Sequence, residues 1–186
     1  MSYIGLYDDC GSRNTFYVLK NRKGVGFKSF ENKEKAEFAR RVQSKLAEDN
    51  LAPRVYSVVG RIMIPSDYDT DEMTLSNWGY VTEIAKPMPE CYDDDCDGDC
   101  CGTGCENSIT IENVVSCLDE SGLEYIDGHR GNFGFVRRNR KWIAVVIDVG
   151  IESFGDWDDR IYGGFDDSYE DSGCDCSMCR EAREAI

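Results

Sequence analysis

The sequence predicts an α+β protein with an antiparallel sheet in its N-terminal half, and three observations support this fold class. Short segments that alternate apolar and polar residues fill most of the first 85 residues. Two other segments carry apolar residues at spacings of three and four, which predicts helices with one buried face. The C-terminal half contains two apolar runs joined by a basic turn, the pattern of a hairpin. With 186 residues, the chain is long enough for one domain or for two small lobes with a cleft between them.

The N-terminal part predicts three strands and a helix. We expect strands at Tyr3–Tyr7, Thr15–Lys20 and Gly24–Phe30, with a polar loop after the first. A helix is expected from Asn32 to Asp49, and Pro53 follows its end. The apolar stripe of this helix consists of Ala36, Phe38, Ala39, Val42 and Leu46.

The rest of the chain predicts two more strands, a second helix and a hairpin, in that order. Strands are expected at Val55–Ile64 and Trp78–Ala85, which would complete a five-stranded N-terminal part over residues 1–85. A helix is expected at Ile109–Ser121. Its buried stripe would consist of Ile111, Val114, Val115 and Leu118. The hairpin strands are expected at Phe133–Val136 and Trp142–Ile147, with a basic turn between them.

The composition is strongly acidic, with a formal net charge of -15. This charge disfavours nonspecific binding to nucleic acid or to anionic membranes, and makes a protein with a basic surface a plausible partner. We find no apolar run long enough to cross a bilayer, and the first 20 residues lack the pattern of a secretion signal. The sequence therefore predicts a soluble protein of the cytoplasm.

Eight of the ten cysteines lie in two clusters, five in an acidic insert at residues 86–106 and three in the acidic tail at residues 155–186. Without a secretion signal, thiols or metal thiolates are favoured over disulfides. Four thiolates from the two clusters could close a tetrahedral zinc site. The alternative is a solvated acidic loop with free cysteines. The candidate ligands are Cys96, Cys100, Cys101, Cys105, Cys174, Cys176 and Cys179.

Three oxygen-bearing side chains surround the predicted hairpin. Asp127 follows the second helix, Asn132 lies five residues later, and Asp148 comes directly after the second hairpin strand. A carboxylate that takes a proton, together with an amide and a second carboxylate that hold Mg²⁺, is what phosphoryl transfer requires. Each residue also has a structural explanation, because Asp-Gly is a turn dipeptide, Asn is common in loops, and Asp often caps an element.

The segment from Asp127 to Asn132 reads D-G-H-R-G-N, and with Asp148 it resembles the catalytic loop of the protein-kinase-like superfamily. The resemblance is to the small early serine/threonine kinases of lytic tailed bacteriophages, in which D-x-H-x-G-N precedes two short strands and an aspartate. It covers about Tyr3 to Phe154. The resemblance implies a minimal two-lobed kinase fold, with an N-lobe at 1–85, the insert at 86–106, the catalytic part of a truncated C-lobe at 107–154 and the tail at 155–186.

The resemblance also implies roles for individual residues. Asp127 would be the catalytic base, supported by His129, and Asn132 and Asp148 would be the magnesium ligands. Lys28 would meet the nucleotide phosphates, although a lysine at a strand end is also common without such a role. The remaining implied contacts are an ion pair from Glu37 or Glu34 to Lys28, an adenine edge on the backbone near Glu83 and Ala85, and phosphates near Gly11 and Ser12, where the G-x-G-x-x-G pattern is missing.

The expected function is ATP- and magnesium-dependent phosphorylation of serine or threonine on host proteins. One alternative is an acidic pseudokinase or decoy that inhibits a host nucleic-acid-binding or defence protein. Another is a small-molecule kinase of the aminoglycoside type, which His129 and the acidic surface suggest. The short chain after Gly150 contains no A-P-E-like motif and no set of helices for docking a peptide substrate.

Overall fold

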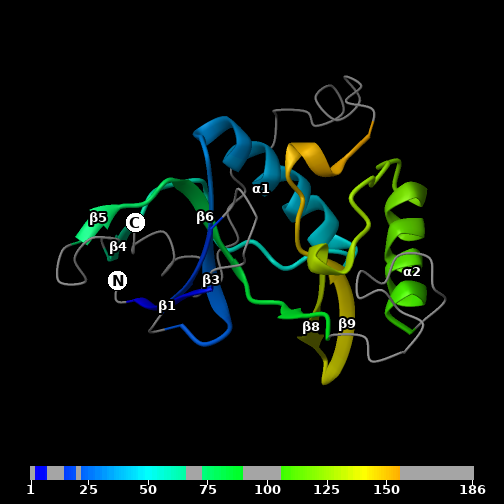
Figure 1. Ribbon diagram of the computed structural model, residues 1–186. Coiled ribbons are helices and arrows are strands. Elements are labelled where there is room, and N and C mark those ends of the chain that lie inside the picture. The colour runs from blue at the N-terminus through cyan, green and yellow to red at the C-terminus, as the bar shows by residue number, and fades with distance from the viewer. Residues whose placement is uncertain (1–2, 8–14, 20–21, 66–72, 90–105, 156–186) are drawn as a thin grey trace. The chain divides into compact units, whose positions relative to one another are not determined.

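The computed structural model describes residues 3–7, 15–19, 22–65, 73–89 and 106–155 (Figure 1). These residues form an α+β fold in which every paired strand is antiparallel, as the sequence predicts. Within the described ranges the α-helices are α1, Lys33–Glu48, and α2, Glu106–Glu120. Neither helix is long and apolar enough to cross a membrane.

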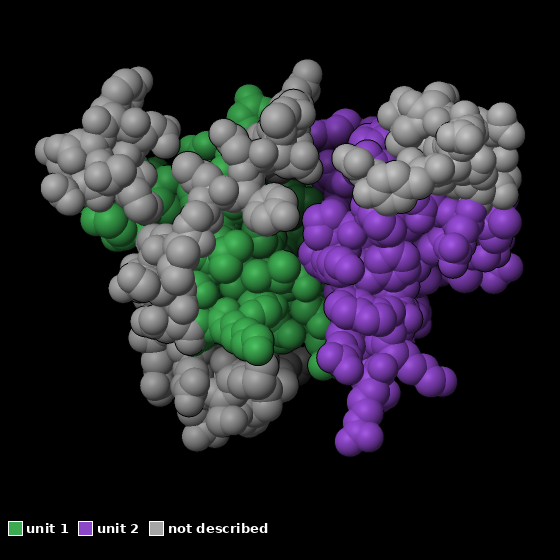
Figure 2. Space-filling model, turned by 60° about the horizontal axis from the view of Figure 1, so that its bottom comes forward, with its two compact units in different colours: residues 1–47, 53–84, 175–186 green, residues 48–52, 85–174 purple. Residues whose placement is uncertain are grey.

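The described residues divide into two compact units, coloured separately in Figure 2. Unit 1 contains the described parts of residues 3–47 and 53–84, and therefore holds α1 and most of the strands. Unit 2 contains residues 48–52 and the described parts of residues 85–155, including α2 and the C-terminal hairpin.

Unit 1 is built on a four-stranded sheet in the order β1-β2-β3-β6. The strands are β1, Tyr3–Tyr7; β2, Thr15–Leu19; β3, Val25–Phe30; and β6, Trp78–Glu83. All four were expected from the apolar alternation, and their positions agree with it to within two residues. The pairing places Lys28 opposite Tyr80, so these two side chains share one face of the sheet.

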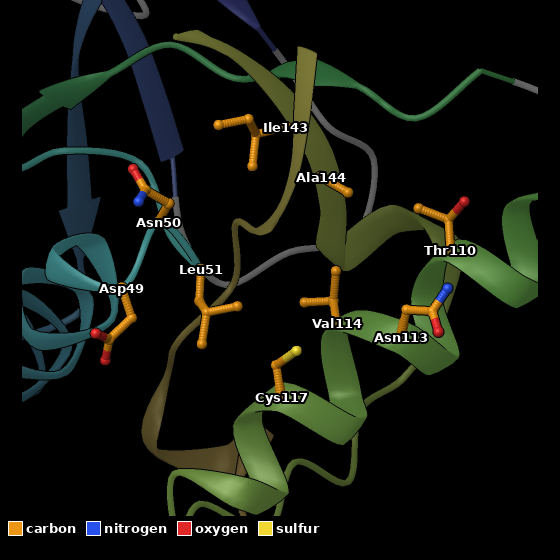
Figure 3. Close-up of a pocket in the computed structure, with 9 residues that line it drawn as sticks. All are labelled: Asp49, Asn50, Leu51, Thr110, Asn113, Val114, Cys117, Ile143 and Ala144. Carbon is orange, nitrogen blue, oxygen red and sulfur yellow. The ribbon is translucent and has the colours of Figure 1, made fainter. Parts of the chain in front are cut away.

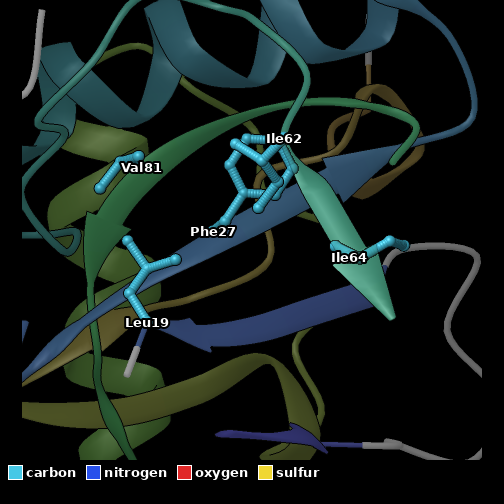
Figure 4. Close-up of a cluster of buried hydrophobic side chains, with 5 residues drawn as sticks. All are labelled: Leu19, Phe27, Ile62, Ile64 and Val81. Atoms are coloured by element: carbon cyan, nitrogen blue, oxygen red, sulfur yellow. The ribbon is translucent and has the colours of Figure 1, made fainter. Parts of the chain in front are cut away.

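One face of this sheet carries a cluster of buried apolar side chains (Figure 4). Phe27 of β3 and Val81 of β6 meet Leu19 of β2 there, and Ile62 and Ile64 close the cluster. Burial of such side chains is the main favourable contribution to folding. Because side chains alternate along a strand, the neighbours of Phe27 and Val81 point to the opposite face.

Helix α1 covers that opposite face, through a buried polar network as well as its apolar stripe. Gln43 of α1 donates hydrogen bonds to Thr82 Oγ1 at 2.6 Å and to the Pro53 carbonyl at 2.9 Å. It also accepts one from the Tyr80 hydroxyl at 2.7 Å. Such satisfied networks fix one arrangement of helix and sheet. The predicted stripe of α1 is buried in full: Ala36, Phe38, Ala39, Val42 and Leu46.

The strand predicted at Val55–Ile64 is wrong as a continuous element. Isolated bridges join Val55 to Thr82 and Gly60 to Gly79, so the segment pairs with β6 at two separate points and not along a continuous ladder. Between them the Ser57 hydroxyl, not a backbone carbonyl, accepts the hydrogen bond of the Val81 N–H at 2.8 Å. This side-chain substitution breaks the ladder. The sheet therefore has four regular strands where five were expected, and the chain next forms a separate ribbon of β4, Met63–Pro65, and β5, Met73–Leu75.

Unit 2 contains a three-stranded sheet in the order β7-β8-β9. Its strands are β7, Lys86–Pro87; β8, Phe133–Arg138; and β9, Lys141–Val146. The predicted hairpin is confirmed, since β8 and β9 pair along their whole length. Asn139 and Arg140 form its two-residue turn, with φ values of 51° and 66°. Helix α2 begins three residues before the predicted start at Ile109, and contacts β9.

Candidate active site

The predicted catalytic loop begins where α2 ends. Gly122, with φ of 80°, follows the last turn, and the Leu123 N–H donates to the Leu118 carbonyl at 3.0 Å, so the helix ends in the left-handed glycine conformation that commonly terminates helices. The chain then pairs with a later segment, because the Ile126 N–H donates to the Ser153 carbonyl at 3.0 Å. This short pairing fixes the start of the loop.

Tyr125 is a buried residue at the start of the Asp127 loop, and it is not among the site residues predicted from the sequence. Its side chain is 6% exposed, and its ring packs edge-on against Phe133 at 5.7 Å and Phe154 at 5.4 Å between centroids. Its hydroxyl donates to the backbone carbonyl of Asp148 at 2.9 Å. Tyr125 therefore connects the start of the loop to the residue that follows the hairpin. The spacing of two residues from Asp127 was the available signal, because such residues share a face of an extended segment.

The loop between Asp127 and Asn132 is closed by hydrogen bonds to one carbonyl. The Asp127 carbonyl accepts from the Asn132 side-chain amide and from the His129 N–H, both at 2.9 Å. The Asn132 N–H in turn donates to the His129 carbonyl at 3.0 Å. Asn132 is buried, whereas the Asp127 side chain is 41% exposed. The loop thus holds Asn132 rigidly and leaves the Asp127 carboxylate accessible.

The hairpin register brings Asp148 back to this loop. Beyond the Phe133–Val146 pair, the Ile147 N–H donates to the Asn132 carbonyl at 2.8 Å, which extends the ladder by one step. Asp148 is the next residue, and its Oδ1 atom accepts a hydrogen bond from the Gly150 N–H at 3.3 Å. The hairpin therefore places Asp148 beside Asn132, as the spacing in the sequence suggests.

Tyr125 lies in an environment that disfavours its ionised form. Burial raises the pKa of the Tyr125 hydroxyl far above its ordinary value, and the negative charges of Asp148 and Asp127 raise it further. The Ser153 and Asn132 side chains oppose this pKa shift in part. The geometric contact of the Tyr125 hydroxyl is its hydrogen bond to the Asp148 carbonyl, and the loop that follows Tyr125 joins Asp127 to Asn132.

Ser153 lies at the same place and was also missed. Its hydroxyl is fully buried, yet no described residue forms a hydrogen bond of good geometry with it, although it lies near enough to Tyr125 to lower the pKa of that phenol. Ser153 Oγ is therefore a buried neighbour of the Tyr125 hydroxyl that forms no hydrogen bond with a described residue.

His129 is the only histidine of the chain, and it contacts Asp127 directly. Its Nε2 atom lies 3.5 Å from Asp127 Oδ1, and its Nδ1 atom accepts a hydrogen bond from the Gly131 N–H at 3.1 Å. In the neutral ring, acceptance at Nδ1 assigns the proton to Nε2, which faces the carboxylate. His129 can therefore orient Asp127.

The donor set of the loop suits a hard cation. Asn132 and Asp148 offer an amide oxygen and a carboxylate oxygen, the ligands that Mg²⁺ takes from proteins when phosphates and water supply the rest. In the described part of the chain, no group of three or more His, Cys, Asp or Glu side chains forms a metal-binding cluster. A site built by these two residues would need ligands from a bound nucleotide.

Two of the predicted nucleotide-binding residues belong to unit 1. Lys28 is 9% exposed and its Nζ atom lies 5.3 Å from the Phe30 ring centroid. It is therefore a largely buried lysine on the α1 face of the sheet and not an exposed strand end. Glu37 forms its ion pair with Lys33, at 3.3 Å on the exposed side of the same helix. The expected Glu37 partner for Lys28 is thus engaged elsewhere.

Two backbone N–H groups of the predicted hinge already donate hydrogen bonds within the protein. The Glu83 N–H donates to the Arg54 carbonyl at 2.8 Å, and the Ile84 N–H donates to the Gly24 carbonyl at 2.9 Å. Both N–H groups are used within unit 1, so an adenine contact through an N–H of residues 83–85 would have to come from Ala85. Gly11, Ser12 and the seven candidate zinc ligands lie outside the described residues: Cys96, Cys100, Cys101, Cys105, Cys174, Cys176 and Cys179.

A separate pocket of about 360 Å³ opens in unit 2 between α2, β9 and residues 49–51 (Figure 3). Leu51, Val114 and Ile143 give it apolar walls, and the exposed thiol of Cys117 lines it. None of the predicted site residues lines this pocket.

Comparisons with protein-family models, with curated proteins and with solved structures gave no match to this chain. The interpretation of the site consequently depends on its own geometry.

Proposed function

We propose that the chain is a minimal kinase that transfers a phosphoryl group from ATP, with magnesium, to serine or threonine hydroxyls of host proteins. The observation that carries the proposal is that the hairpin returns Asp148 to the loop of Asp127 and Asn132, where the Tyr125 hydroxyl holds the Asp148 carbonyl. The three residues come from two sides of one hairpin.

Asp127 has the properties of a general base. Its carboxylate is accessible, while its backbone carbonyl is held by two hydrogen bonds. In the proposed reaction it orients the attacking hydroxyl and accepts its proton, while the new oxygen–phosphorus bond forms and ADP leaves. His129, whose Nε2 atom lies 3.5 Å from Asp127 Oδ1, is the proposed supporting residue for this carboxylate. Such fixed groups contribute because they are already oriented before reaction.

Asn132 and Asp148 are the residues that would hold the metal. Bound magnesium and ATP supply the reactive phosphorus and the positive charge that neutralises the phosphate oxygens. Tyr125 positions Asp148 by holding its backbone carbonyl. Lys28, a buried cation on unit 1, is the proposed partner of the nucleotide phosphates. The proposal also includes a two-lobed kinase fold and a zinc ion that is held by cysteines of the two clusters.

The test is transfer of label from ATP to proteins of a host lysate by wild-type protein and by Asp127→Asn. We expect magnesium-dependent labelling by the wild type and a loss of at least about a hundredfold in the variant, since general-base catalysis typically contributes that much. Asp119→Asn, which removes an exposed carboxylate of α2 in the same unit, is the matched control and should retain full transfer. An aminoglycoside in place of the lysate distinguishes the small-molecule alternative.

A second candidate function is that of an acidic decoy, which the net charge of -15 favours. Carboxylates on such a chain can occupy a basic groove of a host protein without any chemistry. Absence of labelling, together with capture of a basic host protein that is equal for wild type and Asp127→Asn, would favour the decoy over the kinase.

A further inference from the structure

The end of the β8–β9 hairpin is a local exception to the acidic character of the chain. Arg137, Arg138, Arg140 and Lys141 lie within five residues, and residues 128–147 contain no aspartate or glutamate. The chain as a whole has a net charge of -15. Salt limits the reach of exposed charges to about 8–10 Å at physiological ionic strength. The described residues of the hairpin end therefore present a cationic surface to a ligand.

Three of the four cations at the hairpin end are available to a ligand. Arg138 points inward, where its guanidinium donates to Asn50 Oδ1 and to the Ala52 carbonyl, so its role is structural. Arg137, Arg140 and Lys141 are exposed, and none forms an ion pair with another described residue. Their charges are therefore not neutralised within the described part of the protein.

An exposed tryptophan lies among these cations. Trp142 is 57% exposed and is the cross-strand partner of Arg137, which places both side chains on one face of the sheet. Lys86 comes from β7, which pairs with β8 on the side away from β9. Its Nζ atom lies 5.9 Å from the Trp142 ring centroid. Half-buried Phe135 is the cross-strand partner of Lys86, so it shares this face. The face thus combines an indole with cations on two sides.

Arg140 has an unfavourable backbone conformation. It occupies the second turn position with φ of 66°, where glycine is the usual residue because its missing Cβ removes the steric cost. Asn139 at φ of 51° suits the first position, since asparagine tolerates this region. An arginine in this strained backbone conformation, which contacts no described acidic group, indicates a use for its charge.

We propose that this face, formed by Lys86, Arg137 and Trp142 with Arg140 in the turn at its end, binds single-stranded nucleic acid. A base stacks on the Trp142 indole, and the cations contact the flanking phosphates. An acidic peptide would satisfy the cations but would leave the exposed indole without a stacking partner. The proposal does not depend on phosphoryl transfer, and it modifies the expectation, drawn from net charge alone, that nucleic acid is not bound directly.

The experiment measures fluorescence anisotropy of labelled single-stranded oligonucleotides of about 12 nucleotides with the full chain. Trp142→Leu should weaken binding by roughly tenfold or more, since base–aromatic stacking contributes on this scale. Arg137→Ala should reduce the slope of log K against log salt by about 0.7, the value for one phosphate contact on a single strand. Lys33→Ala, which removes a cation beside Trp78 in unit 1, is the control and should bind like the wild type.

Arg140→Gly should change oligonucleotide binding and the stability of the fold in opposite directions. It should weaken the oligonucleotide complex and reduce the salt slope while raising the melting temperature, because glycine adopts the turn conformation without strain. Circular dichroism of each variant checks that the fold is retained. Three results would overturn the proposal: no binding at about 50 mM salt, where electrostatic contacts are strong; unchanged affinity in Trp142→Leu; or equal binding of polyglutamate, which would assign the face to acidic peptides.

Discussion

Replacing Tyr125 with phenylalanine removes one hydroxyl from the centre of the candidate site and keeps the ring. The contacts with Phe133 and Phe154 are edge contacts of that ring, so they should persist. The lost hydrogen bond to the Asp148 carbonyl leaves a buried acceptor with one donor fewer. We expect the free energy of unfolding at neutral pH to fall by about 1–2 kcal/mol.

The same substitution should change the dependence of stability on pH. The pKa of Tyr125 is raised in the folded protein, whereas in the unfolded chain it returns to the ordinary value of 10.0. Above pH 10.0 the unfolded chain loses the Tyr125 proton and the folded protein keeps it, so unfolding becomes easier as pH rises. Wild type should therefore lose about 1.4 kcal/mol per pH unit in this range relative to Tyr125→Phe. The stability difference between the two proteins shrinks accordingly.

Urea unfolding of both proteins at neutral pH and at a series of alkaline pH values measures this difference directly. The other tyrosines are common to both proteins, so their titration cancels in the comparison. The reasoning would be refuted if Tyr125→Phe were as stable as wild type at neutral pH, or if the difference stayed constant into the alkaline range. Either result would mean that the hydroxyl is not buried beside two carboxylates.

Three further predictions concern the framework. Gln43→Leu removes the acceptor of the Tyr80 hydroxyl and the two hydrogen bonds that Gln43 donates. The free energy of unfolding in urea should fall by about 3 kcal/mol. An unchanged urea midpoint would contradict a stabilising role of this hydrogen-bond network. Gly79→Ala would put a Cβ 2.1 Å from the Lys28 carbonyl and should separate β3 from β6, with a loss of about 2 kcal/mol or more and a lower melting temperature. Elemental analysis of protein purified under reducing conditions should find about one zinc per chain, and a folded, metal-free sample would exclude the zinc proposal.

The fold was largely predictable because its periodicities are local. The stripe of α1 and the two strands of the hairpin follow from the spacing of apolar residues, and each buries the face that the spacing indicates. The prediction of a continuous strand at Val55–Ile64 was wrong, and the cause cannot be read from the spacing of apolar residues. Ser57 replaces a backbone acceptor with its own hydroxyl, which requires knowledge of Val81, a residue distant in sequence.

The candidate site was predictable only in part. Asp127, Asn132 and Asp148 could be identified because their spacing around a hairpin is visible in the chain. Tyr125 could not be assigned a role from the sequence, because its hydroxyl acts on a carbonyl 23 residues later, after the hairpin has turned the chain back. The expected ion pair of Lys28 with Glu37 or Glu34 stays a prediction, and Glu37 forms an exposed ion pair with Lys33 one turn earlier in the same helix.

Calorimetric binding of ATP, with and without magnesium, to wild type and to Asp148→Asn tests the central claim most directly. The amide at position 148 keeps the shape of the side chain and removes the charge that would hold the metal. We predict magnesium-dependent binding by the wild type and at least a roughly tenfold weaker affinity in the variant, equal to about 1.4 kcal/mol. Asp119→Asn should bind like the wild type. Equal affinity in wild type and Asp148→Asn, or binding that does not depend on magnesium, would contradict the account.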